Sequence, residues 1–212
     1  MIRFSILGFP TVVDWWFFLP CVLLGGGWSA RDADDWAIVG LWTAVVFVSI
    51  MVHELGHGLA GKKYGARPRI LLHGFGGTTF LPGGNFTRPQ SIIVSAAGPI
   101  ASLLLGAVIL GLNQVLHDKP RLLRIAMEDG LYIAAWWTIL NLLPIQPLDG
   151  GQILRDVLGP ALRTVAAVVG GVVALAAAYW MFRGGQPIMV FMFLMLAYHN
   201  FTQQPMQGGV ET

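Results

Sequence analysis

Charged residues are scarce in this chain. Only 11% of its 212 residues are Asp, Glu, Lys or Arg, whereas a soluble domain carries about 25%. Cys21 is the single cysteine, which excludes an intramolecular disulfide and a thiolate cluster for a metal. The formal net charge of +2 is too small to indicate a nucleic-acid partner. With 55% hydrophobic residues and a mean hydropathy of +0.66, the composition is typical of an integral membrane protein.

Uncharged runs divide the sequence into apolar segments. We expect an all-α membrane fold of about six transmembrane helices, forming one polytopic domain over residues 1–212. The expected spans cover residues 15–30 (with the residues before Asp14), 36–64, 89–116, 131–148, 164–182 and 188–201. A span needs about 20 apolar residues, so the first and last segments are the shortest fits.

Residues 70–87 are also uncharged, yet their composition argues against a helix. Five glycines and Pro82 interrupt this stretch, at a cost of about 1 kcal/mol per Gly and about 3 kcal/mol for Pro in a helix interior. Apolar residues before the glycines and Thr78-Thr79-Phe80 after them favour a membrane re-entrant, β-hairpin-like loop at about 66–88. At that depth, irregular backbone needs protein or a wet cavity around it.

His53-Glu54-Leu55-Gly56-His57 carries the strongest chemical signal. Residues four apart share one helix face, so both histidines can direct a ring nitrogen at one metal ion. Glu54 can then reach a metal-bound water. A catalytic zinc site usually has three protein ligands, so this motif predicts a third ligand elsewhere.

Asp149 is the candidate for that third ligand. His53 follows Asp35 by 18 residues, about 27 Å of helix, and Asp149 follows Asp129 by 20 residues, about 30 Å if helical. The two motifs reach a similar depth only if residues 70–87 turn back instead of crossing. The alternative is that Asp149 is a turn residue in Leu-Asp-Gly-Gly.

Three motifs together resemble the site-2 proteases, the intramembrane zinc metalloproteases. They are His53-Glu54-x-x-His57, Ala97-Gly98-Pro99 and Asn141…Pro144…Leu148-Asp149-Gly150, in the family's order within a core of about 36–155. The resemblance implies one Zn²⁺ per chain, bound by His53, His57 and Asp149, with Glu54 as the catalytic carboxylate. It also implies substrate or transition-state binding by Asn141 and by the hairpin at Gly76.

The sequence departs from the family pattern at two positions. Ser102 stands where relatives often carry Asn, and Gln146 stands where a proline is common. The sequence also leaves no long soluble segment for a PDZ or CBS domain, so we expect a minimal form. His73, in the hairpin, either approaches the metal or, the favoured reading, is a hydrogen-bonded loop histidine.

The expected activity is zinc-dependent hydrolysis of peptide bonds within or near transmembrane segments of single-span or polytopic membrane-protein substrates. The expected setting is the lipid bilayer of a prokaryotic cell membrane, without nucleic acid. Eight basic residues against five favour a cytoplasmic N-terminus and an active site toward that side. Two alternatives are a catalytically silent relative that binds membrane proteins and a metal transporter. The intact Glu54 disfavours the first, and clustered polar groups disfavour the second.

Overall fold

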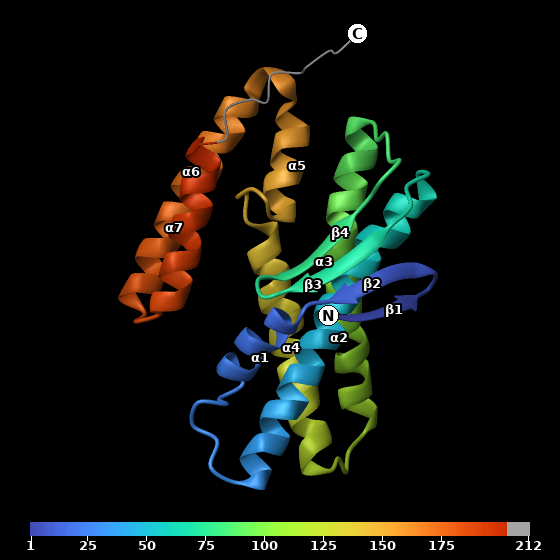
Figure 1. Cartoon of the computed structure of the whole chain (residues 1–212), viewed down its shortest axis with the longest axis vertical. Helices are drawn as coiled ribbons and strands as arrows, with labels where there is room; N and C mark the ends of the chain where they lie inside the picture. The colour runs from blue at the N-terminus through green and yellow to red at the C-terminus, as the bar shows by residue number, and fades with distance from the viewer. Residues whose placement is uncertain (203–212) are drawn as a thin grey trace. The chain divides into compact units, whose positions relative to one another are not determined.

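The computed structural model describes residues 1–202. Figure 1 draws the helices and strands of the chain. The described residues form two compact units: one comprises 1–86 and 97–138, and the other comprises 87–96 and the described residues from 139 onward. Two helices pass from one unit into the other, α3 (Arg88–Val115) and α4 (Arg121–Leu142).

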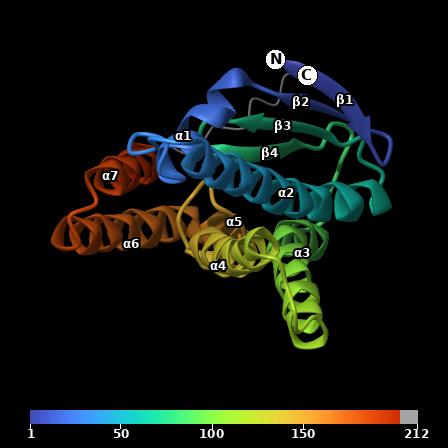
Figure 2. The same cartoon turned by 90° about the horizontal axis from the view of Figure 1, so that it is seen from below.

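A four-stranded sheet belongs to the first unit, so the expected all-α fold is wrong in this respect. The strands are β1 (Ile2–Ile6), β2 (Phe9–Val13), β3 (Arg69–His73) and β4 (Gly76–Phe80), in that spatial order. β2 and β3 pair in parallel, and the other two pairs are antiparallel. Figure 2 shows the sheet lying along one side of α2.

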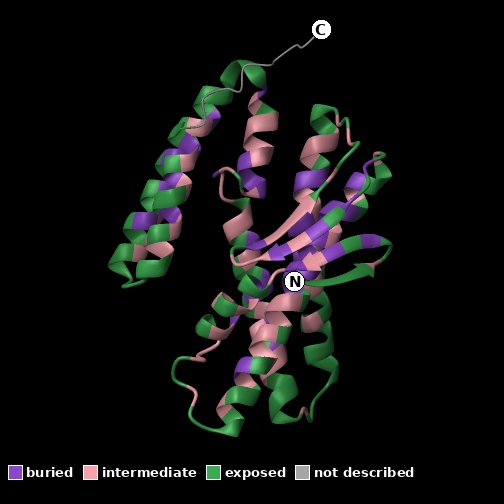
Figure 3. Cartoon of the chain, viewed as in Figure 1, coloured by how far each residue is buried: buried purple, intermediate pink, exposed green. Residues whose placement is uncertain are grey.

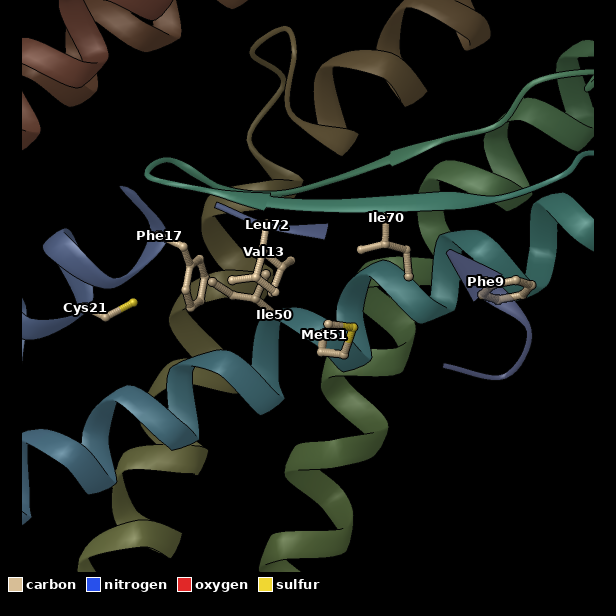
Figure 4. Packing of buried hydrophobic residues seen from close by; sticks show 8 residues of the cluster. All are labelled: Phe9, Val13, Phe17, Cys21, Ile50, Met51, Ile70 and Leu72. Atoms are coloured by element: carbon tan, nitrogen blue, oxygen red, sulfur yellow. The ribbon is translucent and has the colours of Figure 1, made fainter. Parts of the chain in front are cut away.

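The sheet packs on α2 through alternate residues. Phe9, Thr11 and Val13 of β2 and Ile70 and Leu72 of β3 are buried, as period-2 alternation requires. Figure 4 shows these apolar side chains meeting Ile50 and Met51 of α2. Cys21 is buried in the same cluster, so it serves as apolar filler.

The expected first span over 15–30 is not a long helix. Residues 15–17 form the 3₁₀ turn η1, and α1 (Phe18–Leu24) has only seven residues. A helix of this length covers about 10 Å, too short for a bilayer. The residues before Asp14, which the prediction joined to this span, form β1 and β2. Apolar character alone did not separate strand from helix here.

α2 (Ala33–Lys63) confirms the expected helix through the His-Glu motif, with 31 residues. Asp32 caps its first turn by accepting a 2.9 Å hydrogen bond from the backbone N–H of Asp35. Acidic residues occupy the first turn, and Lys62 and Lys63 the last, as the helix dipole favours.

Three helices among the described residues are long and apolar enough to cross a membrane: Ala33–Lys63, Arg88–Val115 and Pro160–Arg183. Two further expected spans fit a membrane crossing less well. α7 (Pro187–Thr202) is short, with 16 residues, and the first turns of α4 carry charged side chains. α4 also ends at Leu142, before the prolines, rather than reaching residue 148. Figure 3 shows that many residues of the helices are exposed. Many of these are large and apolar, as a lipid-facing surface would require.

A β-hairpin spans residues 69–80. β3 and β4 pair antiparallel from Arg69↔Phe80 to His73↔Gly76, and no helix forms over residues 70–87. Its position within a membrane stays a prediction.

The second unit contains α5 (Asp149–Leu158), the 3₁₀ turn η2 (Pro160–Leu162), α6 (Arg163–Arg183) and α7. α6 and α7 lie side by side in Figures 1 and 2. Small residues on α6 permit close packing, and Ala174 and Ala178 are buried against Phe193 and Ala197 of α7. Ile145, from the segment between α4 and α5, is fully buried in this cluster.

Candidate metal centre

Two histidines of α2 direct their ring nitrogens toward each other. His53 and His57 are only 2% and 8% exposed, and their Nε2 atoms lie 3.1 Å apart. One helical turn separates the residues, so the helix itself sets the spacing of the two nitrogens. Two imidazole nitrogens this close fit a shared metal ion.

Gly98 of α3 leaves the space beside both rings open. A Cβ atom at this position would lie 2.8 Å from His53 Nε2 and would also contact His57 Nε2. Gly56 of α2 faces the same helix, since a Cβ there would lie 2.8 Å from the Ala101 Cβ. Ala97-Gly98-Pro99 therefore brings α3 close to α2, and residue 98 places no Cβ atom beside the two Nε2 atoms.

Ser102 lies one turn after Gly98 and orients the first histidine. Its Oγ is 3.1 Å from His53 Nδ1, and the Ser102 side chain is buried. A metal-binding histidine commonly uses its second ring nitrogen in such a bond, which fixes the ring's orientation. The sequence marked Ser102 only as a departure from the family pattern, and its i+4 spacing from Gly98 was the available signal.

Glu54 lies under strand β4. Its carboxylate is 4% exposed, and the Thr79 hydroxyl lies 2.6 Å from Oε2 and 3.0 Å from the Glu54 main-chain oxygen. Gly77 precedes Thr79 by two residues on the same face of the strand, and a Cβ there would lie 2.5 Å from Oε1. The strand therefore holds the carboxylate closely on one side, a role that sequence reasoning did not assign to Thr79.

Asp149, the third candidate ligand, belongs to the second unit. It is the first residue of α5 and is 7% exposed. Two imidazoles and one carboxylate are a donor set that Zn²⁺ accepts at catalytic sites. The buried position of all three fits a bound cation, because buried ionisable groups need a compensating partner.

The remaining candidates have distinct settings. Asn141 lies, half-buried, in the last turn of α4. Gly76 opens β4 with φ +121°, and a Cβ there would lie 2.8 Å from the Trp137 ring. His73 uses both ring nitrogens within the hairpin, with Thr78 Oγ1 at 3.0 Å and the Phe75 N–H at 3.3 Å. The hydrogen-bonded reading of His73 is therefore confirmed.

Comparison with known proteins identifies the family. The model of the Peptidase M50B-like family matches residues 33–147. A relative in Methanocaldococcus jannaschii named zinc metalloprotease MJ0392 is 31% identical over 160 residues, which cover 73% of this chain and 44% of that protein. The chain thus spans less than half the length of that relative.

A solved structure shows the same fold. The site-2 protease from Methanocaldococcus jannaschii superposes with a TM-score of 0.68 at 27% identity, covering 100% of this chain and 98% of that one. The family match includes the His53-Glu54-x-x-His57 motif and Ala97-Gly98-Pro99. The chain therefore belongs to the M50B-like peptidases, the metalloprotease family of the site-2 proteases.

Proposed function

We propose that this protein is a zinc endopeptidase that hydrolyses peptide bonds within or near the transmembrane segments of other membrane proteins. The observation that carries this proposal is the pair of buried histidines, His53 and His57, whose Nε2 atoms lie 3.1 Å apart. Glu54 lies beside the first of them on a helix long and apolar enough to cross a membrane. Placing a carboxylate and two histidines in a membrane-spanning helix costs free energy, so such residues usually mark a functional site.

His53, His57 and Asp149 would hold the ion. Zn²⁺ bound there would supply a Lewis acid for the scissile carbonyl and an activated water. Ser102 supports this role by fixing the His53 ring through Nδ1, and Gly98 supports it by leaving the approach to both Nε2 atoms open.

Glu54 acts as the general base in this proposal. Its carboxylate takes a proton from the attacking water and then delivers that proton to the leaving amine. The Thr79 hydroxyl donates to Oε2, which fixes the orientation of the carboxylate. Asn141 would offer a side-chain N–H donor to the developing oxyanion.

The substrate must present an extended peptide, because a transmembrane helix hides its peptide bonds in its own hydrogen bonds. β4 is the last strand in the sheet order of the described residues, so one of its edges faces away from β3. An unwound substrate segment would add to that edge as a further strand, with Gly76 at its start. Proline at Thr78 or Phe80 should then impair cleavage while zinc stays bound, and unchanged cleavage would rule out strand addition.

The catalytically silent alternative shares the fold but needs no general base. The intact Glu54, buried and bonded to Thr79, favours the protease. The proposed setting is a prokaryotic cell membrane with the N-terminus and the site toward the cytoplasm, and the proposed partners are membrane-protein substrates.

The decisive experiment compares the wild type with Glu54→Gln in detergent or liposomes, using a candidate single-span substrate and measuring bound zinc in both. The proposal expects Glu54→Gln to keep its zinc and to cleave about 10²- to 10⁴-fold more slowly. Equal cleavage by both proteins would reject Glu54 as the base. Absence of zinc from the active wild type would reject the metal-dependent mechanism.

A further inference from the structure

One buried side chain of α7 holds the segment that leads to Asp149. Asn200 is 2% exposed, and its Oδ1 accepts a 3.1 Å hydrogen bond from the Gln146 backbone N–H. Its Nδ2 donates to the Gln146 carbonyl at 2.7 Å and to the Leu196 carbonyl at 2.8 Å. The amide thus binds both backbone groups of Gln146 and is itself anchored to the preceding turn of α7.

α6 closes around the same contact. A Cβ at Gly170 would lie 3.1 Å from the Asn200 Cγ and 2.9 Å from the Pro144 carbonyl oxygen. Ile145, next to Gln146, is fully buried among apolar residues of α6 and α7. The segment at 144–146 is therefore fixed by the α6–α7 pair.

The start of α5 rests on this segment. A Cβ at Gly151 would lie 2.5 Å from the Gln146 nitrogen, and one at Gly150 would lie 2.5 Å from the Leu143 carbonyl oxygen. The Leu148 N–H also donates to the Ile145 carbonyl at 2.8 Å. Because these contacts leave no space between Gln146 and the first turn of α5, a shift of Gln146 displaces Asp149.

We propose that Asn200 is a positioning residue of the metal centre, holding Asp149 in place through the backbone of Gln146. This inference rests on the proposed function, in which Asp149 is the third zinc ligand. All of these contacts lie within the second unit. They connect Asn200 to Gln146, and Gln146 to the first turn of α5, which begins at Asp149. The α6–α7 pair thereby serves the site although it contributes no ligand.

Zinc release into a chelator tests the proposal on the purified full chain, with zinc content and thermal unfolding measured in parallel. Asn200→Leu keeps the side-chain volume and removes all three hydrogen bonds, so it should release zinc about tenfold faster, as losses of outer contacts typically do. Gln146→Pro removes the N–H donor and keeps the carbonyl acceptor, so it breaks one of the three hydrogen bonds of Asn200 and should give a smaller acceleration. If Asn200→Leu does not fold, Gln146→Pro still tests the contact between Asn200 and the Gln146 backbone.

Two matched controls separate positioning from general stability. Gln146→Ala removes the side chain but keeps both backbone groups, so zinc release should equal that of the wild type. Phe193→Leu loosens the α6–α7 core without touching Asn200, so it should lower the unfolding temperature without accelerating zinc release. Acceleration by Phe193→Leu equal to that by Asn200→Leu would overturn the proposal.

Asp149→Asn distinguishes failure of this inference from failure of the proposed function. If Asp149→Asn weakens zinc retention and both Asn200→Leu and Gln146→Pro release zinc at the wild-type rate, the positioning role is wrong and the ligand assignment stands. If Asp149→Asn itself retains zinc like the wild type, the ligand assignment fails and the inference fails with it.

Discussion

The two regions that supply the candidate ligands hold them by different means. His53 and His57 lie within α2, a 31-residue helix whose backbone hydrogen bonds set the spacing of the two rings. Asp149 begins the 10-residue helix α5 after a segment with two prolines, and contacts from α6 and α7 fix that segment. A ligand inside a long helix needs few external supports, whereas a ligand at a helix start depends on side chains distant in sequence.

The largest expected effect comes from filling the space beside the Nε2 atoms of His53 and His57. Gly98→Ala places a Cβ 2.8 Å from His53 Nε2, where the ion would bind. We expect loss of zinc and of cleavage in a protein that still folds. Metal analysis of the purified variant checks this outcome.

Gly106→Ala is the matched control on the same helix. The nearest atom to its Cβ would be the Ala134 Cβ at 3.5 Å, an ordinary van der Waals contact. Zinc content and cleavage should therefore be unchanged. Full zinc occupancy in Gly98→Ala would show that the ion binds away from the two Nε2 atoms.

Removing Asp149, the candidate ligand at the start of α5, should have the next largest effect. Asp149→Ala leaves two histidines, and a site with two protein ligands binds zinc more weakly than one with three. We expect a fall in zinc affinity of more than about 100-fold, exceeding that for loss of an outer contact. Titration with a competing chelator measures it. Full occupancy would place the third ligand elsewhere.

Removing the Ser102 hydroxyl, which contacts His53 Nδ1, should have a smaller effect. Ser102→Ala deletes the 3.1 Å contact at His53 Nδ1 and leaves the three ligands intact. Zinc affinity should fall by about 10- to 100-fold. Ser102→Asn, which restores a polar partner of the kind that relatives often carry, should recover part of the loss. An affinity equal to the wild type in Ser102→Ala would mean that α2 alone orients the ring.

Sequence patterns predicted the parts of this fold that local chemistry determines. The uncharged run before His53 and the glycines after Ile70 predicted α2 and the β3–β4 hairpin. β1 and β2 were missed because their apolar residues were assigned to a membrane span, although Phe9, Thr11 and Val13 alternate as a strand requires.

Contacts between distant residues lay outside the reach of those patterns. Ser102 is 49 residues from His53, Thr79 is 25 from Glu54, and Asn200 is 54 from Gln146. No periodicity links residues so far apart, because tertiary packing alone brings them together. Motifs therefore identified the candidate ligands, while the groups that contact His53, Glu54 and Gln146 required the structure.

The smallest expected effect concerns Thr79, which orients Glu54 without touching a ligand. Thr79→Val preserves shape and removes the 2.6 Å hydrogen bond to Oε2. A hydrogen bond to a charged group contributes at least about 1.5 kcal/mol, so kcat should fall about tenfold, with KM and zinc content unchanged. Thr79→Ser should restore most of the rate. Thr78→Val is the control, since Thr78 bonds to His73 instead. An equal loss of kcat in both valine variants would mean that the hairpin's stability, rather than the orientation of Glu54, limits the reaction.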